Sequence, residues 1–279
     1  MLWYDLIKSF LIGVVQGITE WLPVSSTAHM LLFNECFPLP YENEFSETFF
    51  TLIQLASILA VIVIYFDRLC PFSKKESKQD SRQKLRLWGN VLLGSIPVAA
   101  VGFIFDPIIE KLFYSDTGNV SRIGNFVIAA SLIFYGVLFI ALERKGESKN
   151  VCVTPKRAFC IGLFQSLAIV PGTSRSGATI LGARTLGMSR QESAEFSFFL
   201  AIPAMLGAGA YKILKLFLSG ITPSFEEGLV LLVGCVSAFA VSVSVIGFLT
   251  GFLKKHTFVP FGIYRIILGA VILIILIFR

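Results

Sequence analysis

Six stretches of this chain stay apolar for about twenty residues, the length that a helix needs to cross a hydrocarbon core of ~30 Å. Charged residues make up only 15% of the sequence, against the ~25% that is usual in soluble globular domains. The apolar side chains are too numerous for one or two globular cores, so the surplus must face lipid. The expected spans are Thr48–Phe66, Leu85–Phe105, Ile123–Leu142, Phe196–Leu218, Leu229–Leu253 and Val259–Phe278. The expected fold is an all-α polytopic membrane protein, a single integral-membrane domain over residues 1–279.

The loops between these spans alternate in charge. Asp67–Arg86 holds seven Lys and Arg residues and Glu143–Arg157 holds five, whereas Asn34–Glu47 and Ser219–Gly228 hold none. Because short cytoplasmic loops collect Lys and Arg, the first two loops are predicted to be cytoplasmic and the other two to lie outside. The formal net charge of +6 follows from this orientation. Since the basic residues do not form a face interleaved with aromatics, no nucleic-acid partner is expected.

Two further apolar segments are interrupted. Leu6–Leu22 contains polar residues and stops at Pro23, while Ala158–Val170 ends after thirteen residues at Pro171. The charge alternation fits six crossings if each of these segments enters and leaves on one side, the first from outside and the second from the cytoplasm. The polar residues also indicate that the first segment is retained and is not cleaved as a signal peptide.

The two interrupted segments resemble each other. Ile12–Gln16 matches Ile161–Gln165 at an offset of 149 residues, and Pro23–Thr27 matches Pro171–Arg175 at an offset of 148. Broken hydrophobic segments in corresponding positions of two halves are typical of an inverted-topology repeat with its site between the halves. Non-helical backbone at membrane depth must line a protein-walled, wet cavity. The expected repeats cover about 1–142 and 155–279, each with one re-entrant helical hairpin.

The second break carries groups that bind phosphate. Gly172 allows a tight turn that exposes backbone amides, and Arg175 lies among hydroxyl residues where a helix is expected to begin. Amides, a helix N-terminus and a guanidinium all favour a phosphate. The alternative is a capped helix break with Arg175 snorkelling to an interface, but an Arg inside a membrane is costly without an anion. The expected substrate-binding residues of this loop are Gly172, Thr173, Ser174, Ser176 and Thr179.

The first break carries a candidate catalytic group. Gln16 and Glu20 are four residues apart and share one face of a helix. If Pro23 ends that helix and another begins near Ser25, then Ser26 and His29 share one face of the second piece. A hydroxyl beside an imidazole, with a carboxylate in reach, activates a nucleophile or positions a general acid. The expected catalytic residues are Glu20, Ser26, His29 and Arg175, and Gln16, Ser25 and Thr27 are expected to bind substrate. Ser25, Ser26 and Thr27 can equally serve as N-caps.

Other chemistry has little support in the sequence. Five scattered cysteines and two histidines favour neither a disulfide framework nor a zinc site. A metal would have to be hard and oxygen-ligated. Gln54, Glu195 and Arg265 are expected to form hydrogen bonds between helices.

These motifs resemble the bacterial undecaprenyl-diphosphatase family, the lipid pyrophosphatases associated with bacitracin resistance. The matching stretches are Gln16–Glu20, Pro23–His29, Pro171–Thr179, Glu195–Phe198 and Pro260–Arg265, and the similarity runs from about Leu6 to the C-terminus. The resemblance implies an inner-membrane enzyme that converts undecaprenyl diphosphate to undecaprenyl phosphate and inorganic phosphate. The product is the carrier lipid recycled for peptidoglycan synthesis, and the active site is expected to open toward the periplasm.

The resemblance also implies residue roles. Arg175 would bind the diphosphate with help from Ser174, and Ser26 is the candidate nucleophile, with attack by water left open. His29 and Glu20 would act as acid and base or position a divalent cation, Mg²⁺ or Ca²⁺. The family's motif has Glu or Gln at the first position and Glu four residues later. This chain has the neutral Gln16 at the first position, so it has no charged metal ligand there.

Two other classes of function are alternatives to a lipid diphosphatase. Inverted repeats with broken helices are also the hallmark of secondary transporters and lipid flippases. A membrane scaffold has little support, because it would not need two polar loops at hydrocarbon depth. The sequence leaves the oligomeric state open, and a homodimer is one option.

Overall fold

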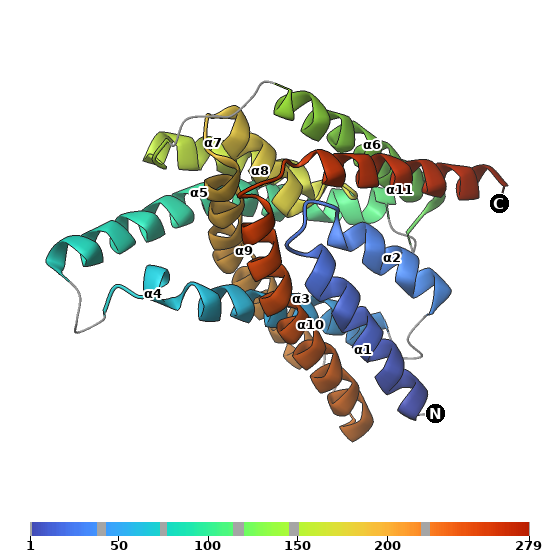
Figure 1. Cartoon of the computed structure of the whole chain (residues 1–279). Helices are drawn as coiled ribbons and strands as arrows, with labels where there is room; N and C mark the ends of the chain where they lie inside the picture. Colours follow the sequence, from blue (N-terminus) through green and yellow to red (C-terminus); the bar gives the residue numbers. More distant parts are fainter. Residues whose placement is uncertain are drawn as a thin grey trace.

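The chain is helical throughout its described part (Figure 1). This is a computed structural model, and it describes residues 2–37, 43–72, 77–113, 120–144, 151–218 and 224–278. The helices are α1 Leu2–Thr19, α2 Ser26–Cys36, α3 Asn43–Ile64, α4 Phe66–Leu69, α5 Lys78–Phe113, α6 Arg122–Glu143, α7 Pro155–Ser166, the short 3₁₀ helix η1 Leu167–Ile169, α8 Arg175–Thr185, α9 Arg190–Leu218, α10 Phe225–Phe252 and α11 Val259–Phe278. Six of them, α3, α5, α6, α9, α10 and α11, are long and apolar enough to cross a membrane. This confirms the predicted all-helical class and its six spans.

The two predicted breaks interrupt the helices where the sequence indicates. α1 ends at Thr19 and a turn leads to α2, while α7 and η1 lead through a second turn to α8. Ser25 caps α2 by accepting from the amide of Ala28, and Ser174 caps α8 by accepting from the amide of Gly177. Both cap residues have positive φ, 75° and 73°, a strained conformation for a residue other than glycine. The equivalent caps are therefore 149 residues apart, whereas the second sequence match pairs Ser26 with Ser174.

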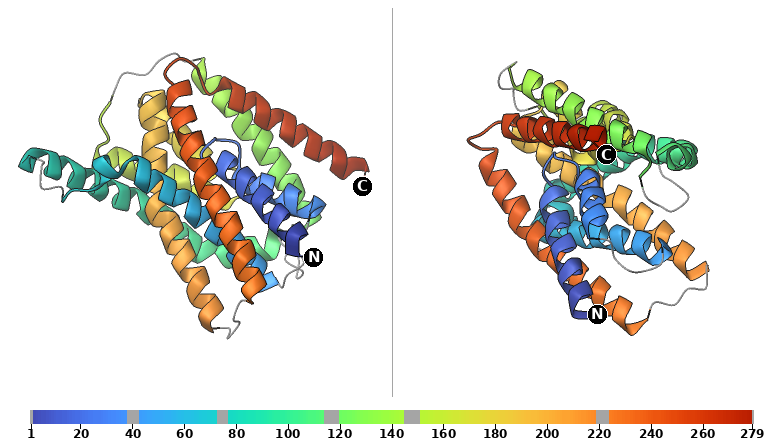
Figure 2. Two further views of the ribbon diagram at one scale, coloured as in Figure 1. Left: turned by 60° about the horizontal axis from the view of Figure 1, so that its bottom comes forward. Right: turned by 90° about the vertical axis from the view of Figure 1, so that its right-hand side faces the viewer.

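Each broken helix packs closely on one long span. α1 lies against α10, α7 lies against α5, and α6 lies alongside α11, as the views in Figure 2 show. Glycines allow the first two contacts, because a Cβ on Gly13 would overlap Ser237 and Gly234, and a Cβ on Gly162 would overlap the carbonyl of Gly94. α3 packs against both α9 and α10 in the middle of the molecule. This packing holds both turns inside the protein.

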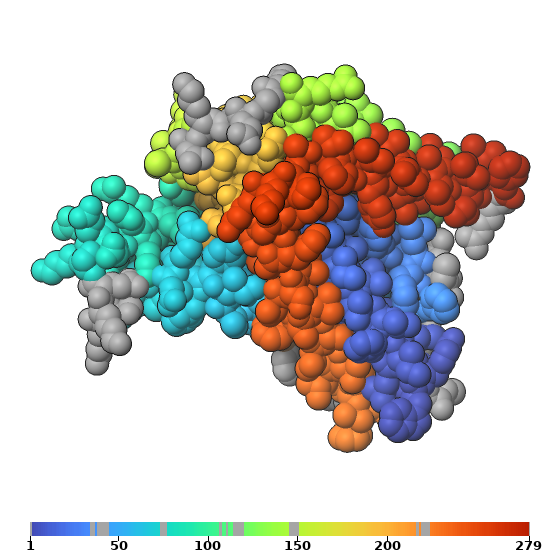
Figure 3. Space-filling view, in the orientation of Figure 1, coloured from blue at the N-terminus to red at the C-terminus, as the bar shows by residue number. Residues whose placement is uncertain are grey.

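Large apolar side chains cover much of the outside of the long helices. Figure 3 shows one face, on which α10, α11 and α1 lie side by side. Phe103 on α5 is 90% exposed, and Phe248 on α10 and Ile277 on α11 are more than half exposed. Such a surface suits lipid and not water. Parts of the loops that carry the predicted charge alternation, at 38–42, 73–76, 114–119, 145–150 and 219–223, lie outside the described residues.

Candidate active site

The turns after α1 and before α8 meet in the interior, and Glu20 lies at their junction. Its Oε1 accepts from Nη2 of Arg175 at 2.8 Å, across 155 residues of sequence. Its Oε2 accepts from Oγ of Ser26 at 2.9 Å and from Nε2 of Gln16 at 2.9 Å. The side chain of Glu20 is only 4% exposed. The structure thus brings three expected site residues, Gln16, Ser26 and Arg175, to the buried carboxylate of a fourth, Glu20.

Gln16 and Glu20 meet because the helical path continues one residue beyond the end of α1. The amide of Glu20 still donates to the carbonyl of Gln16 at 3.0 Å, so the two side chains share the face that their spacing predicts. The turn then reverses the chain, and Ser26 begins α2 facing back toward Glu20. The expected proximity of carboxylate and hydroxyl is therefore present.

Arg175 is the first residue of α8, and its side chain is held by protein contacts while a part of it stays exposed. Its Nη1 donates to the carbonyl of Ser197 on α9 at 2.9 Å, and its guanidinium lies 5.9 Å from the centre of the Trp21 ring. The side chain remains 15% exposed, and its buried Nε has no hydrogen-bond partner. A guanidinium with an unused donor at a helix N-terminus can bind an additional anion.

The hydroxyl residues of the second loop mostly bind protein groups. Ser176 Oγ lies 3.3 Å from the carbonyls of both Glu20 and Leu22. Thr179 Oγ1 lies 2.6 Å from Oγ of Ser197. Ser176 and Thr179, both expected to bind substrate, are buried, and their contacts fasten the second loop to the first loop and to α9.

Ser174 is the partly exposed hydroxyl of this loop. Its Oγ accepts from the amide of Gly177 at 3.1 Å and lies 3.2 Å from Oγ of Ser176. It therefore stands at the open end of α8, beside Arg175, where a phosphate oxygen could accept from it. In the first loop, Thr27 is exposed and Ser25 is buried as the cap of α2.

His29 lies on α2 with both ring nitrogens engaged. Nδ1 lies 2.7 Å from the carbonyl of Ser25, and Nε2 lies 2.6 Å from the hydroxyl of Tyr264 on α11. A carbonyl can only accept, so Nδ1 carries the proton, and in the neutral ring Nε2 accepts from Tyr264. The rings of His29 and Tyr264 are also stacked, with their planes 6° apart. The expected contact between His29 and the nucleophile is thus indirect, through Ser25.

Arg265 on α11 is buried and hydrogen-bonded, as expected, but its partners are the two turns and not another helix. Nη1 donates to the carbonyl of Pro23 at 3.1 Å, and Nη2 donates to the carbonyls of Gly172 and Thr173 at 2.9 Å each. Gly172 has a φ of 87°, a conformation that favours glycine. The signal was a charged residue in an otherwise apolar span, which usually marks a functional site.

Glu195, the other charged residue for which a bond between helices was expected, pairs with Arg68. The two side chains are 2.5 Å apart, and Arg68 belongs to the short helix α4. This ion pair links α4 to α9 and takes no part in the site around Glu20.

The site offers oxygen ligands for a hard divalent cation. Among the described residues, no group of three or more His, Cys, Asp and Glu side chains could hold a metal ion on its own. Glu20 supplies one carboxylate, and the buried Oε1 of Gln16 has no hydrogen-bond partner. Mg²⁺ is often bound by one or two carboxylates together with substrate phosphates and waters. Glu20 and Gln16 therefore fit a cation that binds together with a phosphate ligand.

Comparison with known proteins supports one family over almost the whole chain. Residues 9–271 match the family model described as bacitracin resistance protein BacA. Undecaprenyl-diphosphatase 1 of Clostridioides difficile is 48% identical over 273 residues, which cover 96% of this chain and 95% of that relative. The undecaprenyl-diphosphatase of Acetivibrio thermocellus is 45% identical and covers 97% of both chains, and that of Streptococcus mutans is 45% identical over 98% of this chain and 96% of the relative.

Proposed function

This chain belongs to the bacitracin resistance protein BacA family, and on that premise we propose that it hydrolyses undecaprenyl diphosphate to undecaprenyl phosphate and inorganic phosphate. The observation that carries the proposal is the convergence of Arg175, Glu20 and Ser26 from two turns in one buried site. The reaction returns the carrier lipid to peptidoglycan synthesis. It also confers bacitracin resistance, in accord with the name of the family.

Binding of the diphosphate is assigned to the second loop. Phosphoryl transfer needs stabilisation of charge on the transferred group more than covalent chemistry. Arg175, the hydroxyl of Ser174 and the first amides of α8 offer donors on one side of the site. When the substrate binds, its negative charge competes with Glu20 for the guanidinium, so the pair between Arg175 and Glu20 loosens.

Ser26 is assigned the attack on the terminal phosphorus. Its Oγ donates to Oε2 of Glu20 at 2.9 Å, so the carboxylate can take the hydroxyl proton as the bond to phosphorus forms. The bond between the terminal phosphorus and the bridging oxygen then breaks, which releases undecaprenyl phosphate. Water hydrolyses the phosphoserine and releases inorganic phosphate. The same geometry supports Glu20 over His29 as the base.

His29 is assigned a positioning role. It holds the carbonyl of Ser25, the residue that precedes the nucleophile, and Tyr264 holds His29 in turn. Glu20, with Gln16 beside it, would hold a divalent cation, Mg²⁺ or Ca²⁺. Such a cation supplies positive charge that stabilises the phosphate oxygens.

The hairpins α1–α2 and α7–α8 are proposed to be re-entrant elements of an inverted repeat, with halves at about 1–142 and 155–279. Support comes from the matched packing of α1 on α10 and of α7 on α5, and from the matched caps Ser25 and Ser174. The basic loops favour a cytoplasmic location for the N-terminal ends of α5 and α7. The protein then lies in the inner membrane, with its site open toward the periplasm.

Phosphate release by the purified protein tests the function. Wild-type protein in detergent should release inorganic phosphate from undecaprenyl diphosphate, and Ser26→Ala and Arg175→Lys should release far less. Arg175→Lys keeps the charge but removes the planar fork, so it separates bidentate binding from charge alone. Absence of release, together with vectorial movement of the intact lipid in proteoliposomes, would favour the transporter class.

A further inference from the structure

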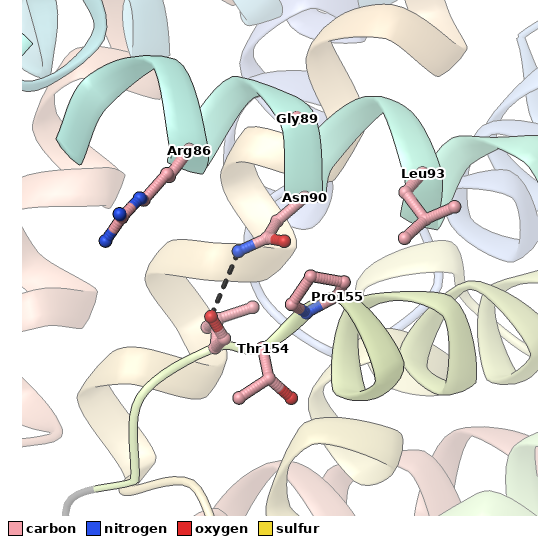
Figure 4. A pocket seen from close by; sticks show the side chains of 7 residues that line it. Arg86, Gly89, Asn90, Leu93, Thr154 and Pro155 are labelled. Carbon is pink, nitrogen blue, oxygen red and sulfur yellow. Dashed lines mark hydrogen bonds between the residues drawn. The ribbon is translucent and has the colours of Figure 1, made fainter. Parts of the chain in front are cut away.

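A cavity lies away from the site around Glu20, between α5 and the segment that leads into α7 (Figure 4). Its volume is about 610 Å³, and it is open on one side. The residues that line it are Arg86, Gly89, Asn90 and Leu93 from α5, and Val153, Thr154 and Pro155 from the opposite segment. Asn90 bridges the two walls by donating from Nδ2 to the carbonyl of Val153 at 3.0 Å. None of these residues takes part in the reaction assigned above.

The α5 wall changes from charged to apolar along its length. Arg86, Gly89, Asn90 and Leu93 follow one another at helical spacing and lie on one face of α5. Arg86 is the last charged residue before the apolar stretch of α5 that runs to 105. With the apolar stretch of α5 in the hydrocarbon core, Arg86 falls at the level of the lipid headgroups, and Leu93 lies about 10 Å further along the helix axis.

We propose that this cavity binds the headgroup end of an anionic phospholipid from the leaflet that faces the basic loops. The guanidinium of Arg86 would take the phosphate, for which its fork is suited. Asn90 and the exposed Thr154 would face the glycerol and ester region. Leu93, Val153 and Pro155 would contact the first part of the acyl chains.

Charge complementarity selects an anionic lipid. None of the seven described residues that line the cavity is acidic. Arg86 and Val153–Pro155 belong to two stretches of the sequence, 67–86 and 143–157, that are rich in Lys and Arg, and basic pockets between membrane helices on the cytoplasmic side bind anionic headgroups. A neighbouring cavity of about 130 Å³ that shares Val153 is different, because Glu192 and Glu195 line it together with Arg68.

A lipid in this cavity would touch two elements that support the second turn. α5 contacts α7 closely where Gly162 lies on Gly94, and α7 leads through η1 to Arg175. The occupant would therefore reinforce the packing of α5 on α7. This binding does not depend on the proposed hydrolysis, so each can be tested without the other.

Two glycines of α5 provide a matched test. A Cβ added to Gly89 or to Gly102 would meet nothing within 4 Å, but only Gly89 lines the cavity. Gly89→Leu fills the cavity without removing charge, and Gly102→Leu adds the same side chain elsewhere on the same helix. Two arginines of α5 provide a second matched pair. Arg86→Ala removes a charge that lines the cavity, and Arg82→Ala removes a charge one helical turn away that does not line it.

The experiment uses the full chain, reconstituted in nanodiscs of phosphatidylcholine with a minor fraction of phosphatidylglycerol, and native mass spectrometry counts retained lipids. Wild type, Gly102→Leu and Arg82→Ala should retain phosphatidylglycerol preferentially. Arg86→Ala should retain at least about five-fold less, the factor for losing one Arg that contacts the anionic headgroup, and Gly89→Leu should also retain less because its side chain occupies the cavity. Unchanged elution on size exclusion shows that the variants are folded. Equal retention by Gly89→Leu and wild type, or equal retention of phosphatidylcholine and phosphatidylglycerol by wild type, would overturn the proposal.

Discussion

Arg175 Nη2 and Glu20 Oε1 lie 2.8 Å apart in a place where only 4% of the Glu20 side chain is exposed. The two residues come from different turns, so neither half of the chain contains this pair by itself. A buried ion pair adds little to stability by itself, but removal of one partner leaves an uncompensated charge. The proposed reaction gives the pair a role, because an anionic substrate would displace Glu20 from Arg175 and so prepare both groups.

Arg175→Ala is expected to lower kcat by at least about 100-fold, the scale of losing one preorganised group that stabilises developing charge. The measurement is release of inorganic phosphate from undecaprenyl diphosphate at saturating substrate. Arg122→Ala, which removes an arginine from the first turn of α6, serves as the control and should stay near wild type. A folded Arg175→Ala protein with wild-type turnover would rule out the assignment of this residue.

Glu20→Ala should also lower kcat by at least about 100-fold, because it removes the group that accepts from Ser26 and pairs with Arg175. Glu226→Ala removes an exposed carboxylate at the start of α10 and should leave turnover unchanged. A titration of divalent cation in the same assay adds a second readout. If Glu20 helps to hold the cation, a conservative Glu20→Gln variant should need a higher concentration for half-maximal activity, and an unchanged requirement would argue against that role.

Tyr264→Phe removes one hydroxyl and keeps the ring that stacks on His29. Loss of the 2.6 Å hydrogen bond to Nε2 should lower kcat about three- to ten-fold, the range for one net hydrogen bond, with KM nearly unchanged. Tyr211→Phe, at an exposed position on α9, is the control. In a His29→Ala background the same change should have little further effect, since the two residues act as a unit. Full additivity of the two changes would contradict the positioning role.

Gly162→Ala should destabilise the protein by about 1–3 kcal/mol, the range for overpacking a close contact. The added Cβ would meet the carbonyl of Gly94 on α5, which is backbone and cannot rotate away. Gly247→Ala, where nothing lies within 4 Å of the added atom, should be neutral or slightly stabilising because alanine favours helix. Thermal unfolding in detergent compares the two, and equal melting temperatures would show that the contact is not tight.

The six spans could be predicted because long apolar runs leave few alternatives to a membrane helix. The meeting of Gln16, Glu20 and Ser26 could also be predicted, since a helical spacing and a proline break determine it locally. The partners of His29 could not, because Tyr264 is 235 residues away and its place depends on how α11 packs. The sequence match pairs Ser26 with Ser174, whereas the structure shows that the cap equivalent to Ser174 is Ser25. The difference of one residue arises because Pro23 and Pro171 stand at different distances from these caps.

Arg265 also illustrates what sequence patterns leave undetermined. A charged residue in a span indicates a buried partner but not its identity. Only the packed structure brings the carbonyls of Pro23, Gly172 and Thr173 to one guanidinium.

This arrangement has a consequence for biosynthesis. α11 follows every other described helix along the chain, so Arg265 enters the bilayer after both turns have been translated. Until then, the carbonyls of Pro23, Gly172 and Thr173 lack this donor. Before α11 packs, the two turns are therefore held together only by other contacts, such as those of Arg175 and Ser176 with the first turn.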